Sequence, residues 1–168
     1  LIFPGCILLL VAIFASLPFL MGTLGNIAGG YLSDHLVARF GLRNGRRFVG
    51  VGALVCGSAL LLAAALTPSK TLAVALLSVG FGVMDLMLPS AWAVCLDIGG
   101  RHAGLVSGAM NTAGQLGGFV CTVLFGYIVR ETGSYDAPLF VIAASVFIAA
   151  LLFARIDASR PLLEPHHA

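Results

Sequence analysis

Charged residues are scarce in this chain, and their scarcity excludes most soluble folds. Of its 168 residues, only 10% are charged and 60% are hydrophobic. A soluble domain carries about 25% charged and about 45–50% apolar residues, so these few charges cannot cover a soluble surface of this size. The net charge of +2 is also too small to indicate a surface for nucleic acid.

Cysteine is present, but it lacks the spacing of a metal site or a disulfide framework. None of the cysteines belongs to a CxxC motif or has a pair of histidines nearby. Each lies inside an apolar run: Cys6, Cys56, Cys95 and Cys121. We interpret them as small packing residues, and the sequence predicts no metal and no cofactor.

The start of the chain lacks the marks of a signal peptide. Before Met21 there is neither a basic segment nor a small-residue cleavage site. The chain begins at Leu1, already apolar, which favours a segment of a longer protein.

Strand-like alternation of polar and apolar residues is missing too, and long apolar runs take its place. A spanning helix needs about 20 predominantly apolar residues. We therefore predict an all-α membrane protein with about five transmembrane helices. Residues 1–155 would form a partial bundle, and residues 156–168, with two prolines, an irregular tail. The predicted spans are about 8–32, 48–66, 71–96, 104–129 and 138–154.

Basic residues are concentrated in alternate connections. The second and fourth connections hold only Lys70 and Arg130. The first connection, the third and the tail hold the other seven: Arg39, Arg43, Arg46, Arg47, Arg101, Arg155 and Arg160. Because Lys and Arg accumulate on the cytoplasmic side of a membrane, the first and third connections and the C-terminus are predicted to be cytoplasmic.

The end of the first run carries a glycine pattern and then a charge pattern. Gly22, Gly25 and Gly29 share one helix face beside Asn26, which is typical of two helices in close contact. Asp34 then precedes Arg46 and Arg47 by about one loop. Such an arrangement either forms a charge-assisted clasp between helix ends or is a solvated basic loop; the spacing alone favours neither.

Two further runs carry polar groups at membrane depth. Asp85 lies mid-run near Pro89, and intramembrane carboxylates usually face a bundle interior or a wet cavity. It is either part of a transport pathway or a structural hydrogen-bonding residue.

Asn111 and Gln115 belong to a small, polar stripe on the fourth run. Their amides must bind either neighbouring helices or a polar ligand.

Several stretches of the sequence resemble a known family. The stretch from Gly29 and Gly30 to Asp34, continued by Gly45 to Arg47, is similar to the signature loop of the major facilitator superfamily. The stretches 92–100 and 104–118 resemble the tenth and eleventh helices of its anion:cation symporter branch. The resemblance implies that the five runs correspond to helices 8–12 of a twelve-helix transporter. The long spacing between Asp34 and Gly45, and the segment 1–10, depart from the family pattern.

The resemblance implies a function. Members of the branch are similar in moving organic anions, such as sugar acids or aromatic acids, usually with protons. On this basis Asn111, Ser90 and Gln115 would bind the substrate, and Asp85 would couple protons or form a polar core. Gly30, Asp34, Arg46 and Arg47 would form a conformational clasp. The partners would be protons, the lipid bilayer of a bacterial inner membrane and the missing N-terminal half.

Three functions are alternatives to an organic-anion transporter. Within the same class, an exporter of drugs or sugar phosphates is the alternative. A non-transporting membrane scaffold is another. An intramembrane serine protease would need a base beside Ser107, but His102 lies at a predicted helix end and His35, His166 and His167 lie in loops or the tail. The sequence therefore predicts that the chain is not an enzyme.

Overall fold

The structure, a computed structural model, describes residues 4–160, with side chains from residue 12 onward. The predicted tail 156–168 is therefore described only as far as Arg160, and the side chain of Cys6 lies outside the described part. Within these residues every regular element is a helix, as predicted. The helices are α1 (Pro4–Leu66), α2 (Lys70–Asp85), α3 (Met87–Gly99), the short 3-10 helix η1 (Gly100–His102), α4 (Ala103–Thr132) and α5 (Ala137–Phe153).

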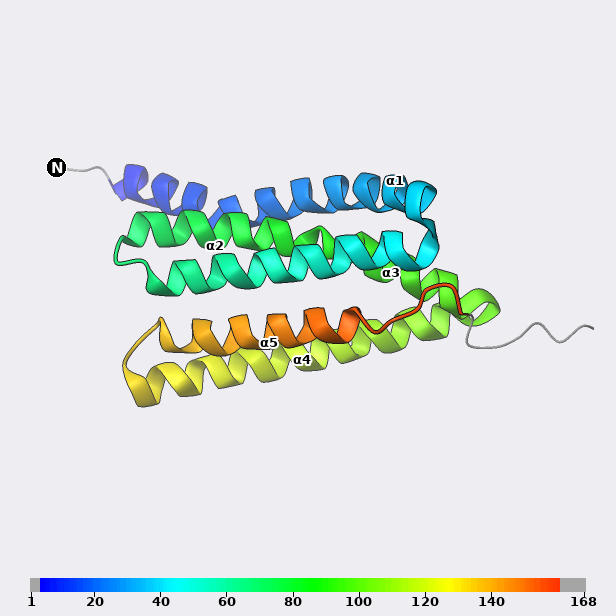
Figure 1. The fold of residues 1–168 in the computed structure, drawn as a ribbon. Coiled ribbons are helices and arrows are strands. Elements are labelled where there is room, and N and C mark those ends of the chain that lie inside the picture. Colours follow the sequence, from blue (N-terminus) through cyan, green and yellow to red (C-terminus); the bar gives the residue numbers. More distant parts are fainter. Residues whose placement is uncertain (1–3, 161–168) are drawn as a thin grey trace, which may run out of the picture.

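Helix α1 is a hairpin of two antiparallel limbs, residues 4–40 and 42–66 (Figure 1). The reversal occurs at Gly41, whose φ of 80° and ψ of 166° suit glycine because it has no Cβ. Gly45 keeps the turn tight, since a Cβ there would lie 2.5 Å from the backbone of Val37. The first limb runs past residue 32, the end of the predicted span, because no helix breaker occurs before Gly41.

The third apolar run forms two helices rather than one. α2 ends at Asp85 and α3 begins at Met87. Pro89 explains the break, because it lacks the N–H that would bind the carbonyl of Asp85 four residues earlier. The chain bends at Leu86 and continues in nearly the same direction (Figure 1).

The helices pack as a partly open bundle. α2 and α3 pack against both limbs of α1, α5 packs against α1, and α4 contacts α3 and α5. A buried hydrogen bond from Ser58 Oγ to the carbonyl of Ala143, 2.9 Å long, joins α1 to α5. In the described part of the chain, no residue of α4 is buried.

Length and composition suit the helices to a membrane. Two helical stretches, Ala12–Leu66 and Lys70–Thr132, are long and apolar enough to cross one, and Ala137–Phe153 is a shorter apolar helix. The first stretch includes the reversal at Gly41, and the second comprises α2, α3, η1 and α4. The helix Ala137–Phe153 is α5. Its 17 residues extend about 26 Å at ~1.5 Å per residue, close to the ~30 Å hydrocarbon core. Large apolar side chains such as Phe19, Ile27 and Leu105 are exposed on the outside of the bundle.

Candidate functional site

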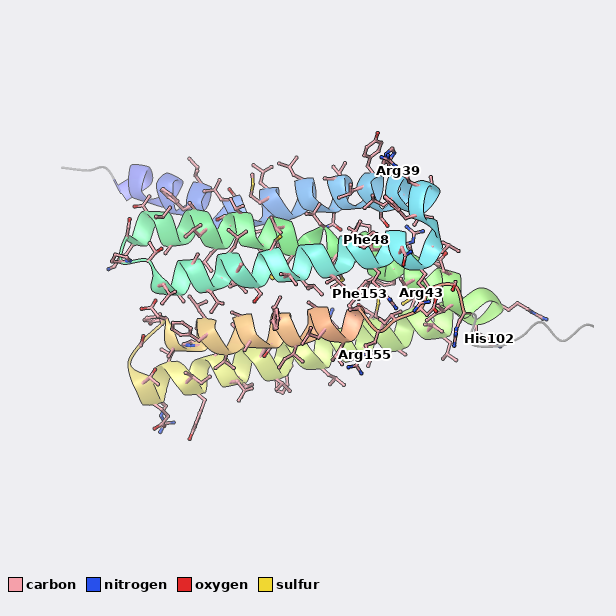
Figure 2. The ribbon with its side chains drawn as sticks, viewed as in Figure 1. Arg39, Arg43, Phe48, His102, Phe153 and Arg155 are labelled. Carbon is pink, nitrogen blue, oxygen red and sulfur yellow. The ribbon has the colours of Figure 1, made fainter. Side chains whose placement is uncertain are left out.

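Positive charge gathers at one end of the bundle. Arg39, Arg43, Arg155 and His102 lie at the end that holds the turn of α1 (Figure 2). Lys70, at the start of α2, and Arg130, near the end of α4, lie at the opposite end (Figure 1). The uneven distribution predicted from the sequence is thus a property of the folded chain.

Arg46 joins three segments at this charged end. Its Nη1 donates to Asp34 Oδ1 at 3.0 Å and to Ser33 Oγ at 2.8 Å, both on the first limb of α1. Its Nε donates to Asp97 Oδ2 on α3 at 3.3 Å. The Arg46 side chain is only 12% exposed, so it is inserted between the segments. We call these four residues the Arg46 clasp.

The clasp includes one residue that sequence reasoning missed. Asp97 was not assigned a role, although it lies at the end of the third run, beside a predicted basic connection. The position of an acid at that helix end was the available signal. Its side chain is 22% exposed, against 77% for Asp34, so Asp97 is the more shielded of the two carboxylates.

Two residues predicted with the clasp lie elsewhere. Arg47 donates from Nη2 to the carbonyl of Ile156 at 2.8 Å and from Nε at 3.3 Å, so it contacts the tail. Gly30 faces Pro89, 3.9 Å from where a Cβ would stand. Gly30 thus contributes to the contact between α1 and α3 one turn away from the charged groups.

Asp85 is bound by an amide and by no cation in the described part of the chain. Asn26 Nδ2 donates to Asp85 Oδ2 at 2.9 Å and to the carbonyl of Gly22 at 3.2 Å. The glycine face makes this contact possible: a Cβ on Gly22 would stand 2.7 Å from Asp85 Oδ2, and one on Gly25 would meet the Gly82 carbonyl. The glycines therefore let α1 touch α2 at the level of the carboxylate.

The three residues predicted to bind substrate are not clustered. Ser90 is fully buried in α3, and among the described residues its Oγ has no hydrogen-bond partner. Asn111 and Gln115 are exposed on α4. α3 and α4 meet instead where Cys95 Sγ lies 3.3 Å from Met110 Sδ. The polar stripe of α4 is therefore open, while Ser90 lies inside the bundle.

A pocket of about 600 Å³ lies between α4 and α5. Its lining is almost wholly apolar and includes Gly117, Leu124 and Val141; Asn111 and Gln115 are not among the lining residues. Such a lining lacks the polar groups that orient a charged ligand. Among residues 4–160, no group of three His, Cys, Asp or Glu side chains is arranged to hold a metal ion.

Comparison with known proteins gives this arrangement a family. The model of the Major Facilitator Superfamily matches residues 4–122. The chain is 37% identical over 146 residues to a probable sulfoacetate transporter of Cupriavidus necator, covering 84% of this chain and 33% of that protein. It is 32% identical to a probable galactarate/D-glucarate transporter of Bacillus subtilis, covering 83% of this chain and 30% of that protein.

A third relative extends the comparison to another bacterium. The chain is 30% identical over 156 residues to a probable galactarate/D-glucarate transporter of Escherichia coli, covering 89% of this chain and 34% of that protein. The chain thus spans about a third of the length of the curated relatives it matches. The predicted resemblance is confirmed: this all-helical chain belongs to the Major Facilitator Superfamily of integral membrane transport proteins.

Proposed function

We propose that the protein to which this chain belongs is a secondary active transporter that moves a small organic anion together with protons. The observation that carries the proposal is the similarity, over 83–84% of the chain, to transporters named for sulfoacetate and for galactarate or D-glucarate. A hexuronate transporter of Bacillus subtilis is 29% identical over 157 residues. Each of these substrates is a small organic anion.

Asn111 is the proposed centre of the substrate site. It lies seven residues after Gly104 on α4, which is roughly 10 Å along the helix at ~1.5 Å per residue, towards the middle of a ~30 Å core. Within residues 4–160 its amide makes no side-chain hydrogen bond, and neither Gly108 nor Gly114 has a neighbour within 4 Å of its would-be Cβ. The amide is therefore free to bind a polar ligand, with Gln115 one turn further along the same face.

Ser90 would join this site only after a rearrangement of α3. Its unpaired, buried Oγ lies four residues beyond the bend at Leu86, and a buried hydroxyl without a partner is costly. A movement at the bend would expose Ser90 and satisfy its hydroxyl. The proposed role of Ser90 therefore belongs to a different conformation from the one described.

Asp85 is the proposed proton site of this part of the transporter. Its only hydrogen-bond partner among the described residues is Asn26, and an ionised carboxylate without a cation is unfavourable at membrane depth. A carboxyl group in this setting can take up a proton without breaking an ion pair. The Asn26 amide can hydrogen-bond to both the ionised and the protonated carboxyl group of Asp85, because it offers both donors and an acceptor.

The proposed mechanism is rocking of two helix bundles about a midplane site. The Arg46 clasp would hold the charged end of this bundle in one conformation. The proposed location is a bacterial inner membrane with the charged end and the C-terminus in the cytoplasm, and the proposed partner is the N-terminal half of the same transporter. An exporter of drugs or sugar phosphates is the alternative within this class.

The proposal is tested with the full-length protein in proteoliposomes. Labelled sulfoacetate, galactarate, glucarate and hexuronate are offered with and without an inward proton gradient. We expect saturable uptake of at least one anion that the gradient accelerates. An uptake rate that is the same with and without the proton gradient would contradict symport with protons. The absence of uptake for every anion would contradict the proposed substrate class.

The role of Asn111 is tested by equilibrium binding of the transported anion. A hydrogen bond to a charged group contributes about 1.5–3 kcal/mol, so Asn111→Ala should weaken affinity by roughly tenfold or more. Asn44→Ala is the matched control, since Asn44 lies in the exposed turn of α1. Normal affinity combined with poor folding of Asn111→Ala would assign the amide to helix packing instead.

A further inference from the structure

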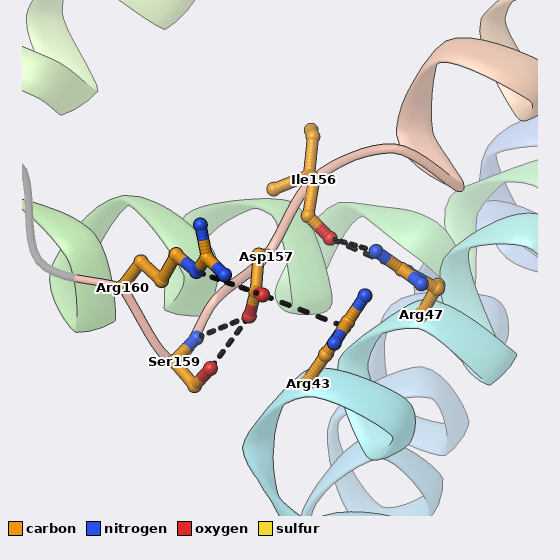
Figure 3. Close-up of polar contacts among 6 residues, drawn as sticks. All are labelled: Arg43, Arg47, Ile156, Asp157, Ser159 and Arg160. Carbon is orange, nitrogen blue, oxygen red and sulfur yellow. Dashed lines mark hydrogen bonds and ion pairs between the residues drawn. The ribbon is translucent and has the colours of Figure 1, made fainter.

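The segment that follows α5 has a defined shape although it is not helical. Asp157 Oδ1 accepts hydrogen bonds from the backbone N–H of Ser159 at 3.1 Å and from Ser159 Oγ at 2.6 Å. These bonds close a local turn, which Figure 3 shows at the lower left. Ala158, in the middle of the turn, is only 4% exposed. The segment is therefore packed against the bundle.

Two arginines from the turn of α1 hold this segment (Figure 3). Arg43 Nε lies 3.4 Å from Asp157 Oδ2. Arg47 directs Nε and Nη2 to the same carbonyl oxygen, that of Ile156. The carbonyl of Ile156 lies three residues beyond the end of α5 at Phe153, and a guanidinium supplies two donors in a fixed geometry that both reach it. The second limb of α1 thus binds the backbone of the segment that follows α5.

The same helical turn of α1 carries the arginine of the clasp. Arg43 precedes Arg46 by three residues and Arg47 by four, so it neighbours both on the helix surface, whereas Arg46 and Arg47 point in different directions. Arg46 binds the first limb and α3, whereas its two neighbours bind the tail. The turn of α1 is consequently fixed from two sides by residues of one helical turn.

We infer that residues 155–160 form a strap that fixes the turn of α1 to the end of α5 and thereby positions Arg46 for its two carboxylates. Arg43, Arg47 and Asp157 are its positioning residues. The strap and the Arg46 clasp both lie at the charged end of this bundle and share the second limb of α1. Its effect on transport rests on the proposed function; its effect on the turn of α1 does not.

The first experiment measures hydrogen exchange in the full-length transporter. An exposed ion pair contributes little, so Arg43→Gln and Asp157→Asn should each accelerate exchange of the amides in residues 42–48 by about two- to fivefold. Asp157→Glu, which keeps the charge, should exchange like the parent protein. Arg160→Gln is the control, because Arg160 binds the same carboxylate from within the strap and is 85% exposed.

Unchanged exchange in both Arg43→Gln and Asp157→Asn would overturn the strap, as would equal acceleration in Arg160→Gln.

The second experiment measures uptake of the transported anion. Asp157→Asn should lower the maximal rate without changing KM, and it should have no further effect in an Arg46→Gln background. Additive effects of the two substitutions, or an unchanged rate for Asp157→Asn, would overturn the positioning of Arg46. Should no anion be transported, the exchange result would still decide whether the strap exists.

Discussion

Replacing Gly25 by Ala tests a contact between the backbones of α1 and α2. A methyl group at this position would meet the carbonyl oxygen of Gly82, and it would stand 2.9 Å from the carbonyl carbon. Both atoms belong to the backbone of α2, so no side chain can rotate away. The two helices must therefore separate to admit the methyl group.

The cost can be worked out from three contributions. Overpacking costs about 1–3 kcal/mol. Separation also stretches the 2.9 Å hydrogen bond between Asn26 and Asp85, and hydrogen bonds between membrane helices contribute about 0.6 kcal/mol on average. Against this, Ala is a better helix former than Gly by about 1 kcal/mol. We expect Gly25→Ala to destabilise the protein by about 0.5–2.5 kcal/mol.

Gly52→Ala is the matched control, because it makes the same change on the same helix. Nothing lies within 4 Å of the Cβ that this substitution adds, so only the gain in helix propensity remains. Thermal unfolding of the full-length protein in detergent should give a lower midpoint for Gly25→Ala and an equal or higher one for Gly52→Ala. If both variants melted at or above the parent temperature, α1 and α2 would not be in backbone contact at this level.

Three more predictions concern the charged end. Single cysteines at positions 44 and 69, on a cysteine-free background, should be labelled from the cytoplasm and from outside respectively; the reverse result would invert the proposed topology. Asp97→Asn should reduce the transport rate more than Asp34→Asn does, because Asp97 is 22% exposed and Asp34 77% and exposed pairs are weak; equal losses would contradict this. The hydrogen bond from Ser159 and the nearby Arg43 and Arg160 hold the pKa of Asp157 below its ordinary 3.8. Its stabilising effect is therefore complete above that pH and lost as pH falls further, so the difference in unfolding temperature between the parent and Asp157→Asn should stay constant from pH 8 to about 5.

Much of the helix arrangement follows from local sequence. Apolar runs of sufficient length define the spanning segments, and Pro89 marks the break between α2 and α3 through its missing N–H. The glycines at 22, 25 and 29 were interpreted as a packing face, and they do contact α2 and Leu86, the residue between α2 and α3. These features depend on residues within a single helical segment, so they can be predicted without knowing which helices pack together.

Contacts between distant helices follow less directly. The pairing of Asp34 with Arg46 spans 12 residues of one hairpin, and the same spacing also fits a solvated loop. The bond from Arg46 to Asp97 spans 51 residues and depends on where α3 packs. Likewise, Arg47 was grouped with Arg46 because they are neighbours in sequence, although successive helical residues point in different directions.

The bond between Arg47 and the Ile156 carbonyl joins residues 109 positions apart, which has a consequence for biosynthesis. Helices enter the membrane in the order of their synthesis, at about 5–20 residues per second. The Asp34–Arg46 pair can form as soon as the α1 hairpin is complete, whereas Arg47 must wait roughly 5–20 s more for its partner at these rates. Through that interval the Arg47 guanidinium lacks this partner, so a hairpin is completed by a residue made 109 positions later.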